Sequence, residues 1–230
     1  MSGDDIVMYL TDAFYDRKIT CPLCSHVYTT KKVLSKYIKT HKVEGDFYAI
    51  YKDVNPNYYA VNVCGECGYA FLDKTQPKIT AYKRERYRQH VGSRWAPREY
   101  GSLRSIMEAL VSFKLAVFCA QFMEEPERTV GGLCLQVAWL YRELGDFEQE
   151  ERFLRDSLDF YTYAYENDRS IDTDGRMTYL LGELHRRMGE QKEAIQYFNL
   201  VISDKQALPK YVRMARDQWS LMRELQQMSG

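Results

Sequence analysis

The sequence predicts a mainly α-helical protein with a small β part. A β module held together by a metal ion is expected to precede an array of helical hairpins. Two observations lead to this fold class. Two Cys-x-x-Cys pairs lie in the first third of the chain, among short β-rich runs that end at turn residues. From Ser102 onward, apolar residues recur at helical spacing, and single glycines separate successive helical stretches.

The two cysteine pairs are Cys21 with Cys24 and Cys64 with Cys67. Each pair can fold into a knuckle that offers two thiolates to a tetrahedral Zn²⁺, and two knuckles complete a closed shell of four sulfurs. The pattern therefore predicts a structural zinc site that leaves no ligand position for water or substrate. Iron also accepts tetrahedral sulfur ligation, and a single Cys-x-x-Cys pair can be a redox dithiol, so both alternatives stay open.

We expect residues 1–75 to form a zinc-ribbon-like β module around this site. Residues 18–28 have the pattern of a strand, a knuckle and a second strand, and the β-rich run 58–63 leads into the second cysteine pair. Residues 46–55 predict a further strand that ends in an Asn-Pro-Asn turn. His26 and His41 lie nearby, but four thiolates complete the shell without them.

Residues 76–101 are predicted to be a basic connector. The stretch 74–98 holds eight Lys/Arg and one Asp/Glu, with aromatic residues interleaved. Basic residues alternating with aromatics are typical of nucleic-acid contacts, and a solvated connector helix gives the same pattern. The candidates for a nucleic-acid contact are Lys83, Arg84, Arg86 and Arg88.

Residues 102–230 are predicted to form a helical domain. The stretches 139–147 and 179–189 each show an amphipathic helix that ends at a glycine, Gly145 or Gly189, before a second amphipathic helix. This pattern resembles the tetratricopeptide repeat, in which helical hairpins stack side by side. The two glycines are 44 residues apart, whereas the family repeat has 34 residues, so we expect a lengthened second helix in the first hairpin.

In the tetratricopeptide family, the first helices of successive repeats line a concave groove. The resemblance therefore implies a partner-binding surface rich in Trp, Tyr and Arg, the residue types that dominate binding hot spots. Its arginines would favour a protein partner with an acidic peptide or another carboxylate group. Trp139 could equally belong to the core between helices. The implied groove residues are Leu135, Trp139, Arg142, Arg176, Tyr179, Glu183, Arg186 and Arg187.

The whole layout resembles a bacterial family of unassigned function, which combines an N-terminal zinc-ribbon-like part with a C-terminal tetratricopeptide-like part. The stretches that carry the resemblance are residues 18–24, 46–48, 55–56, 63–70, 132–145 and 163–165. The resemblance implies this architecture and a bacterial cytoplasmic setting, and it implies no activity.

Charge and motif content narrow the function further. The net charge is zero, although residues 1–100 hold 16 Lys/Arg against 11 Asp/Glu and the remainder holds 16 against 21. No apolar run is long enough to span a membrane, and the acidic first twenty residues do not resemble a signal peptide, so we expect a cytoplasmic protein. The sequence lacks the H-E-x-x-H, P-loop, G-x-G-x-x-G and G-x-S-x-G motifs. We therefore expect a non-enzymatic protein without a small-molecule substrate.

Three functions fit these observations, in decreasing order of support. The first is an adaptor that binds a protein partner through the helical groove. The second is a nucleic-acid-binding zinc ribbon that uses the basic segment. The third is a regulator in which oxidation of the thiolates releases zinc.

Overall fold

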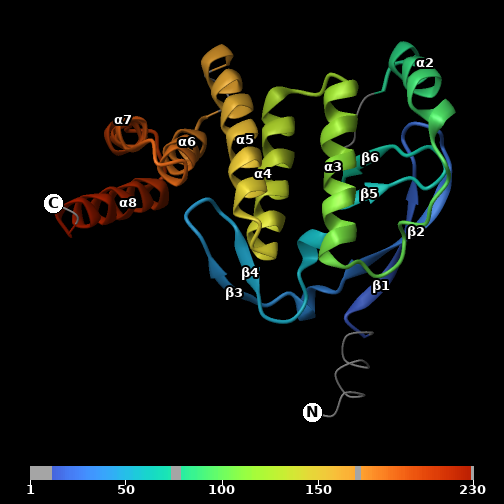
Figure 1. The fold of residues 1–230 in the computed structure, drawn as a ribbon, viewed down its shortest axis with the longest axis horizontal. Coiled ribbons are helices and arrows are strands. Elements are labelled where there is room, and N and C mark those ends of the chain that lie inside the picture. Colours follow the sequence, from blue (N-terminus) through green and yellow to red (C-terminus); the bar gives the residue numbers. More distant parts are fainter. Residues whose placement is uncertain (1–11, 74–78, 169–171, 229–230) are drawn as a thin grey trace. The chain divides into compact units, whose positions relative to one another are not determined.

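The computed structural model describes residues 12–73, 79–168 and 172–228, and its helices and strands are labelled in Figure 1. The chain divides into two compact units. The first comprises Met1–Lys42 and Ala49–Glu125, and the second comprises Val43–Tyr48 and Pro126–Gly230. These units differ from the ranges expected from the sequence, because the long helix after Ser102 belongs to the first unit and six residues of the β module belong to the second.

Among its described residues, the first unit contains short strand pairs, 3₁₀ turns and two α-helices. Strands β1 and β2 are paired, as are β3 and β4 and as are β5 and β6, each pair forming a separate two-stranded sheet. The elements are β1 (Phe14–Thr20), β2 (Val27–Val33), η1 (Ser35–Tyr37), β3 (Thr40–Val43), β4 (Ala49–Tyr51), η2 (Pro56–Tyr59), β5 (Val61–Val63), β6 (Ala70–Leu72), α2 (Ala81–His90), η3 (Gly92–Arg94) and α3 (Ile106–Phe122).

Helix α3 covers the short sheet that β5 and β6 form. Its N-terminus carries a capping box, in which Ser105 and Glu108 satisfy each other's backbone amides. Its buried face includes Phe113, and the buried Cys119 sulfur accepts a hydrogen bond of 3.3 Å from the Ala70 amide in β6. Burial of this face on the sheet explains why α3 belongs to the first unit.

A buried arginine ties the turns of the first unit together. Arg104 is 8% exposed, and its guanidinium donates to the carbonyl oxygens of Tyr58, Val61 and Tyr100 at 2.8–3.1 Å. Its backbone amide donates to the Tyr59 hydroxyl at 3.0 Å. Because a buried cation is costly without partners, these carbonyls fix the path of η2 and of the chain before α3.

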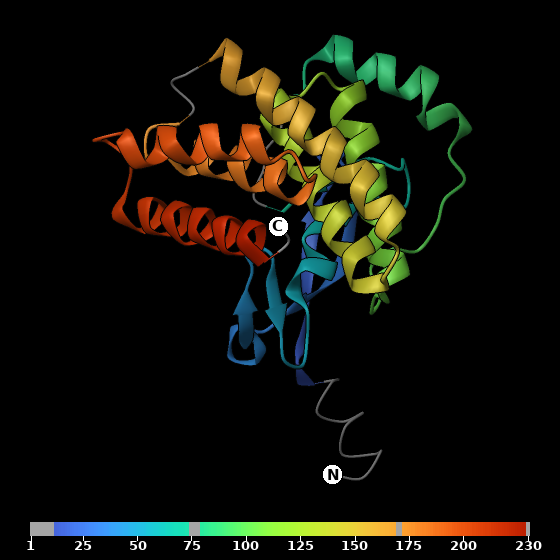
Figure 2. The ribbon, with the colours of Figure 1, turned by 60° about the vertical axis from the view of Figure 1, so that its left-hand side comes forward.

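In the part that the structure describes, the second unit contains five helices and the segment Val43–Tyr48. Helices α4 and α5 form one hairpin, α6 and α7 form another, and α8 packs against the second hairpin. Figure 2 shows α6, α7 and α8 side by side, and α4 lying along α5. The helices are α4 (Glu127–Leu144), α5 (Phe147–Asn167), α6 (Arg176–Arg187), α7 (Gln191–Ser203) and α8 (Pro209–Met228).

Glycines make both hairpins possible. Gly145 and Gly189 end their helices in the left-handed region, with φ of 73° and 76°. A Cβ atom on Gly182 would lie 2.8 Å from the Phe198 ring, so glycine lets α6 approach α7 closely. The predicted hairpins and the lengthened second helix, α5, are confirmed, whereas the tetratricopeptide type of the array stays a prediction.

Candidate functional site

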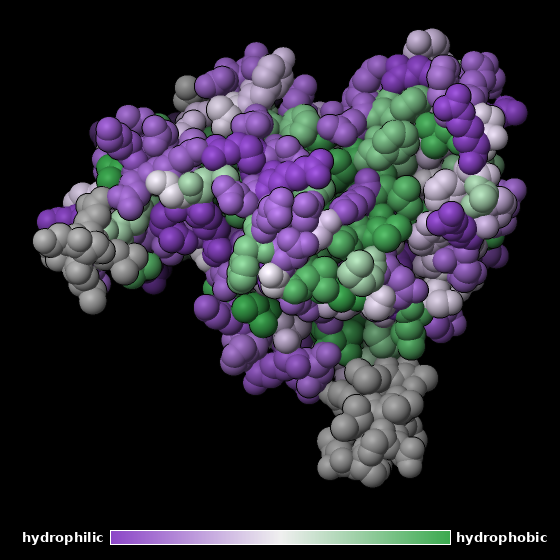
Figure 3. Space-filling view, in the orientation of Figure 1, coloured by the Kyte–Doolittle hydropathy of each residue, from purple (hydrophilic) through white to green (hydrophobic). Residues whose placement is uncertain are grey.

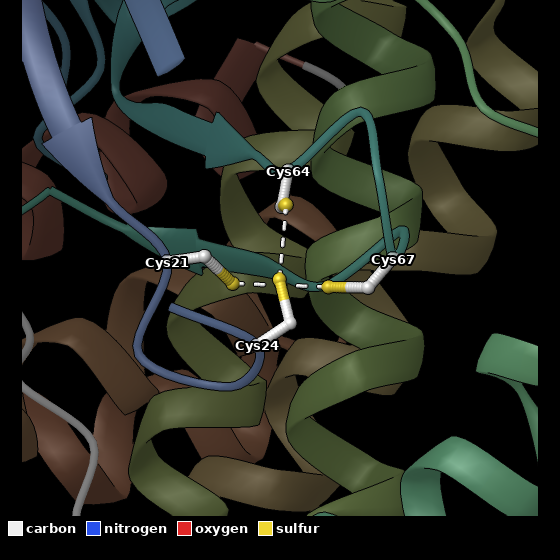
Figure 4. A group of neighbouring side chains, drawn as sticks. All are labelled: Cys21, Cys24, Cys64 and Cys67. Carbon is white, nitrogen blue, oxygen red and sulfur yellow. Dashed lines mark hydrogen bonds between the residues drawn. The ribbon is translucent and has the colours of Figure 1, made fainter. Parts of the chain in front are cut away.

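The four cysteine sulfurs come together at the knuckles of the first unit (Figure 4). All four lie within 4.8 Å of one another, and two of the separations are 3.7 Å (Cys21 to Cys67) and 3.6 Å (Cys24 to Cys64). Zinc–sulfur bonds of about 2.3 Å in a tetrahedron place the sulfurs about 3.8 Å apart. The prediction that both pairs meet at one point is confirmed, and the spacing fits a tetrahedral metal ion.

The two knuckles share one hydrogen-bonding pattern. In the first, the Cys21 amide donates to the His26 carbonyl and the Ser25 amide donates to the Cys21 carbonyl. In the second, the Cys64 amide donates to the Tyr69 carbonyl, and the Gly68 amide donates to the Cys64 carbonyl. Both turns therefore need a left-handed residue four positions after the first cysteine.

Ser25 and Gly68 fill these left-handed positions, with φ of 65° and 74°. The β1–β2 and β5–β6 pairs hold the ends of the two knuckles, because Thr20 pairs with Val27 and Val63 pairs with Ala70. The antiparallel strands thus bring the four sulfurs together.

The basic connector covers the second knuckle. The Trp95 indole nitrogen donates to the Gly65 carbonyl at 2.8 Å, and the Arg98 amide donates to the same oxygen at 3.2 Å. A Cβ on Gly68 would lie 2.4 Å from the Trp95 ring, so the indole packs directly on the backbone of the knuckle. Cys21 and Cys64 are buried, Cys67 is half-buried and Cys24 is exposed.

The close approach of the sulfurs shifts the pKa values of the thiols in opposite directions. The pKa of Cys64 is lowered, chiefly by its interactions with Cys21 and Cys67. The pKa of Cys21 is raised, chiefly by its interaction with Cys64, and that of Cys67 is raised by Cys21 and Cys64. The positive charge of a bound metal ion would favour deprotonation of all four thiols.

His26 and His41 are exposed, and the group of potential ligands found among the described residues consists of the four cysteines alone. The His26 ring stacks on Tyr28, with their centroids 6.2 Å apart. The group of four sulfurs therefore forms without either histidine.

Two of the four basic candidates in α2 bind the C-terminus of α3. Lys83 donates to the Met123 carbonyl, and Arg86 donates to the Phe122 carbonyl and forms an ion pair of 2.6 Å with Glu124. These cations satisfy carbonyls that the helix leaves unpaired and complement its dipole. Arg84 is half-buried, and Arg88 is exposed and lies 3.5 Å from the Glu85 carboxylate. The structure thus gives Lys83 and Arg86 a structural role.

The predicted groove residues of the second unit surround a segment of the same chain. This segment, Val43–Tyr48, has the sequence Val-Glu-Gly-Asp-Phe-Tyr and is called the acidic tip below. It turns tightly, because the Glu44 amide donates to the Tyr48 carbonyl at 2.8 Å and the Phe47 amide donates to the Glu44 carbonyl at 3.0 Å. The strand that the sequence predicts from Asp46 onward begins at Ala49 instead, because Asp46 and Phe47 belong to this turn.

Asp46 is the charged centre of this contact. Its side chain is fully buried, and it accepts hydrogen bonds from Arg142 at 2.8 Å and from the Trp139 indole at 3.0 Å. Arg187 lies 3.4 Å from the same carboxylate. Burial alone would raise the pKa of Asp46, but the hydrogen bonds from Arg142 and the charge of Arg187 outweigh it and lower the pKa below its usual value.

Glu44 adds a second carboxylate, 2.6 Å from Arg142 and 3.2 Å from Arg187. Each arginine also has a carboxylate within the helices, since Arg142 pairs with Glu150 at 2.6 Å and Arg187 pairs with the fully buried Glu183 at 2.9 Å. The two arginines therefore bridge the acidic tip to the helices.

Aromatic contacts complete the arrangement. The Phe47 ring lies 5.6 Å from that of Tyr179 and 6.0 Å from that of Tyr211, and the Arg176 guanidinium lies 5.0 Å from its centroid. Tyr48 stacks on Trp139 at 5.5 Å. Phe47 adopts a φ of 70°, which is unfavourable for a bulky residue and is enforced by this packing.

The predicted groove set therefore divides in two. Trp139, Arg142, Arg176, Tyr179 and Arg187 contact the acidic tip directly. Glu183 and Arg186 form an ion pair of 2.7 Å beside it, while Leu135 is 3% exposed within the helical core. Binding of an external partner by these residues stays a prediction.

Sequence reasoning missed the acidic tip itself and Tyr211. The available signal was two carboxylates, Glu44 and Asp46, within a basic first half and directly before two aromatic residues. This composition complements the arginines and aromatics predicted for the groove.

An apolar stripe lies along α3, where Figure 3 shows hydrophobic side chains at the surface. Met107, Val111 and Phe118 lie on one face of the helix, Leu103 precedes it, and all four are 45–54% exposed. Among the described helices, none combines the length and apolar character needed to cross a membrane.

Comparison with known proteins gives a family. No curated protein and no solved structure matches the chain. Residues 14–222, which include both knuckles, the acidic tip, helices α2 to α7 and most of α8, match the family described as "Uncharacterized protein conserved in bacteria (DUF2225)". The chain therefore belongs to this bacterial family.

Proposed function

We propose that the protein is a non-enzymatic adaptor, in which a structural zinc ion holds the first unit together and a tetratricopeptide-like helical array binds a protein partner. The proposed metal ligands are Cys21, Cys24, Cys64 and Cys67. The proposed setting is the reducing cytoplasm of a bacterium, where thiolates stay available to the metal.

The geometry of the sulfurs supports the structural role of the metal. Four thiolates fill a tetrahedral shell, so a bound zinc ion has no position open for water or substrate. The spacing suits iron as well, and metal analysis of purified protein distinguishes the two. Zinc at about one ion per chain is the expected result.

The observation that carries the adaptor proposal is the chemistry of the groove. Arg142, Arg176 and Arg187, together with Trp139 and Tyr179, hold a six-residue acidic and aromatic segment by ion pairs, hydrogen bonds and ring contacts. These are the interactions by which helical grooves recognise peptides, and Trp, Tyr and Arg are the usual hot-spot residues. The same surface can therefore bind a partner whenever the acidic tip leaves it.

Affinity purification from a bacterial host, followed by mass spectrometry, tests the proposal. The bait is a double variant, Asp46→Asn with Phe47→Ala, called the tip variant below, which weakens the intramolecular contact. We expect it to retain more partner than the wild-type chain, and we expect Arg176→Ala added to it to abolish the retention. The matched control for Arg176→Ala is Arg88→Ala, also added to the tip variant, because Arg88 is an exposed arginine of the first unit.

All baits are compared at equal metal content and helicity. If no captured protein depends on Arg176, the adaptor proposal is wrong.

A thiol-responsive zinc site is a second candidate, and the exposure of Cys24 favours it. Oxidation of an accessible zinc thiolate weakens the shell and releases the metal. Mild peroxide should then release zinc from the native chain, as followed with a chromogenic chelator. Retention of zinc under conditions that oxidise free cysteine contradicts this candidate.

A further inference from the structure

We propose that the partner of the groove carries an acidic–glycine–acidic–aromatic–aromatic segment on a tight turn, and that the chain's own acidic tip is a competing intramolecular copy of this ligand. The inference rests on the proposed adaptor function and names the class of partner. It follows from how the acidic tip is held.

The two central arginines of the groove have carboxylate partners outside the acidic tip. Arg142 pairs with Glu150 at 2.6 Å, and Arg187 pairs with Glu183 at 2.9 Å. Both guanidinium groups are thus fixed by carboxylates on the helices themselves. A groove that is organised in advance can bind a second ligand of the same chemistry without first rebuilding itself.

The positions of the acidic tip define what the groove accepts. Carboxylates are needed at the places of Glu44 and Asp46, which face the two arginines. Glycine is needed between them, because a Cβ on Gly45 would lie 2.7 Å from the Glu183 carboxylate, whose position its two arginine partners fix. The next residue must offer a ring to Tyr179 and Tyr211, and the one after it a ring to Trp139.

The acidic tip can be displaced, because its own conformation is strained. Phe47 holds a φ of 70° so that its ring reaches Tyr179. A partner that presents the same side chains on a relaxed backbone avoids this strain. The intramolecular tip has the compensating advantage of a high effective concentration, so the groove stays closed until a well-matched partner arrives.

A direct binding experiment tests the inference. The probe is a fluorescein-labelled synthetic peptide of residues 40–51, closed into a hairpin by a disulfide between added terminal cysteines. Fluorescence anisotropy measures its binding to the full-length, metal-loaded chain. We expect the tip variant to bind the peptide at least about tenfold more tightly than the wild-type chain, because the intramolecular competitor is weakened.

Two controls make the result specific. A peptide with Asp46→Asn and Phe47→Ala should bind the tip variant at least about tenfold more weakly than the native peptide, because it lacks the carboxylate and the ring. Arg142→Ala added to the tip variant should weaken binding of the native peptide by a similar factor, with metal content and helicity unchanged.

Three outcomes overturn the inference. The first is a folded, metal-loaded tip variant that does not bind the peptide. The second is peptide binding that is indifferent to Arg142→Ala. The third is a wild-type chain that is dimeric in light scattering while the tip variant is monomeric. The groove of each chain would then hold the acidic tip of a second copy.

The inference and the adaptor proposal can fail separately. If the peptide does not bind but a captured protein still depends on Arg176, the ligand class is wrong and the adaptor function stands. If the peptide binds but no captured protein depends on Arg176, the groove serves only to bind the chain's own acidic tip, and the adaptor function is wrong.

Discussion

Lys32 shows how a single buried charge makes stability depend on pH. Its ammonium is largely buried, donates to the Tyr59 carbonyl at 2.5 Å and lies 3.6 Å from the Asp73 carboxylate. Burial lowers its pKa to about 8, and the charge of Asp73 only partly opposes this shift. The folded chain therefore loses this proton at a lower pH than the unfolded chain does.

The first prediction concerns this lysine. Between its folded pKa of about 8 and its unfolded value of 10.5, the unfolded chain binds more protons, so the free energy of unfolding rises with pH across this window. Urea unfolding at a series of pH values should show this rise in the wild-type chain. In Lys32→Met the rise should be reduced, and an identical pH profile in both chains contradicts the assignment.

The second prediction tests the sulfur shell one residue at a time. Cys67→Ser removes one thiolate, so metal content should fall well below one ion per chain and the first unit should lose thermal stability. Elemental analysis and thermal denaturation measure both effects. Cys134→Ala is the matched control, because Cys134 is a buried free cysteine that belongs to α4. Equal metal loss in both variants argues against this site.

At the scale of elements, close helix contacts depend on small residues. Gly182 and Gly189 both belong to the α6–α7 hairpin, but their roles differ. Gly182 faces the Phe198 ring, whereas Gly189 has a left-handed φ of 76° and no atom within 4 Å of the place that a Cβ would take. The first glycine serves packing, and the second serves backbone conformation.

The third prediction separates these roles. Gly182→Ala should destabilise the second unit by about 1–3 kcal/mol, because the added methyl group overpacks the hairpin. Gly189→Asn should change stability little, since asparagine tolerates the left-handed region and the surrounding space is open. Urea denaturation measures both. A larger loss for Gly189→Asn than for Gly182→Ala would contradict the packing argument.

At the scale of the whole molecule, the chain crosses between its two units more than once. It leaves the first unit at Lys42, contributes the acidic tip to the second unit, and returns to the first at Ala49. The buried Asp46 anchors this excursion through Arg142 and Trp139. Arg142 also pairs with Glu44 and Glu150, so replacing Asp46 removes hydrogen bonds to a buried carboxylate but does not leave this arginine without a partner.

The fourth prediction follows from Asp46. Asp46→Asn should destabilise the second unit by about 2 kcal/mol at neutral pH, as measured in urea, because hydrogen bonds to a buried carboxylate are lost. The folded pKa of Asp46 lies below 3.8, so its contribution is fully present above its unfolded pKa and is lost as the pH falls through the folded value. The wild-type and variant chains should thus converge only in acid. Asp53→Asn, at a more exposed carboxylate, should cost much less.

Features that depend on local spacing could be predicted from the amino-acid order alone. Two cysteines separated by two residues form a knuckle wherever a left-handed residue follows, and Ser25 and Gly68 supply it. The helical hairpins follow from apolar periodicity and from Gly145 and Gly189. The turns of the knuckles and the apolar period of the helices are set by residues close together in the sequence. They can therefore be predicted without knowledge of the rest of the chain.

Which surfaces meet became evident only from the folded chain. Periodicity gives α3 an apolar face but does not say that β5 and β6 will cover it, and a basic pattern does not say that Arg86 will bind the end of α3. The acidic tip and the arginines of the groove are almost a hundred residues or more apart in the sequence. Such contacts arise from burial and charge complementarity between distant segments, which no local pattern encodes.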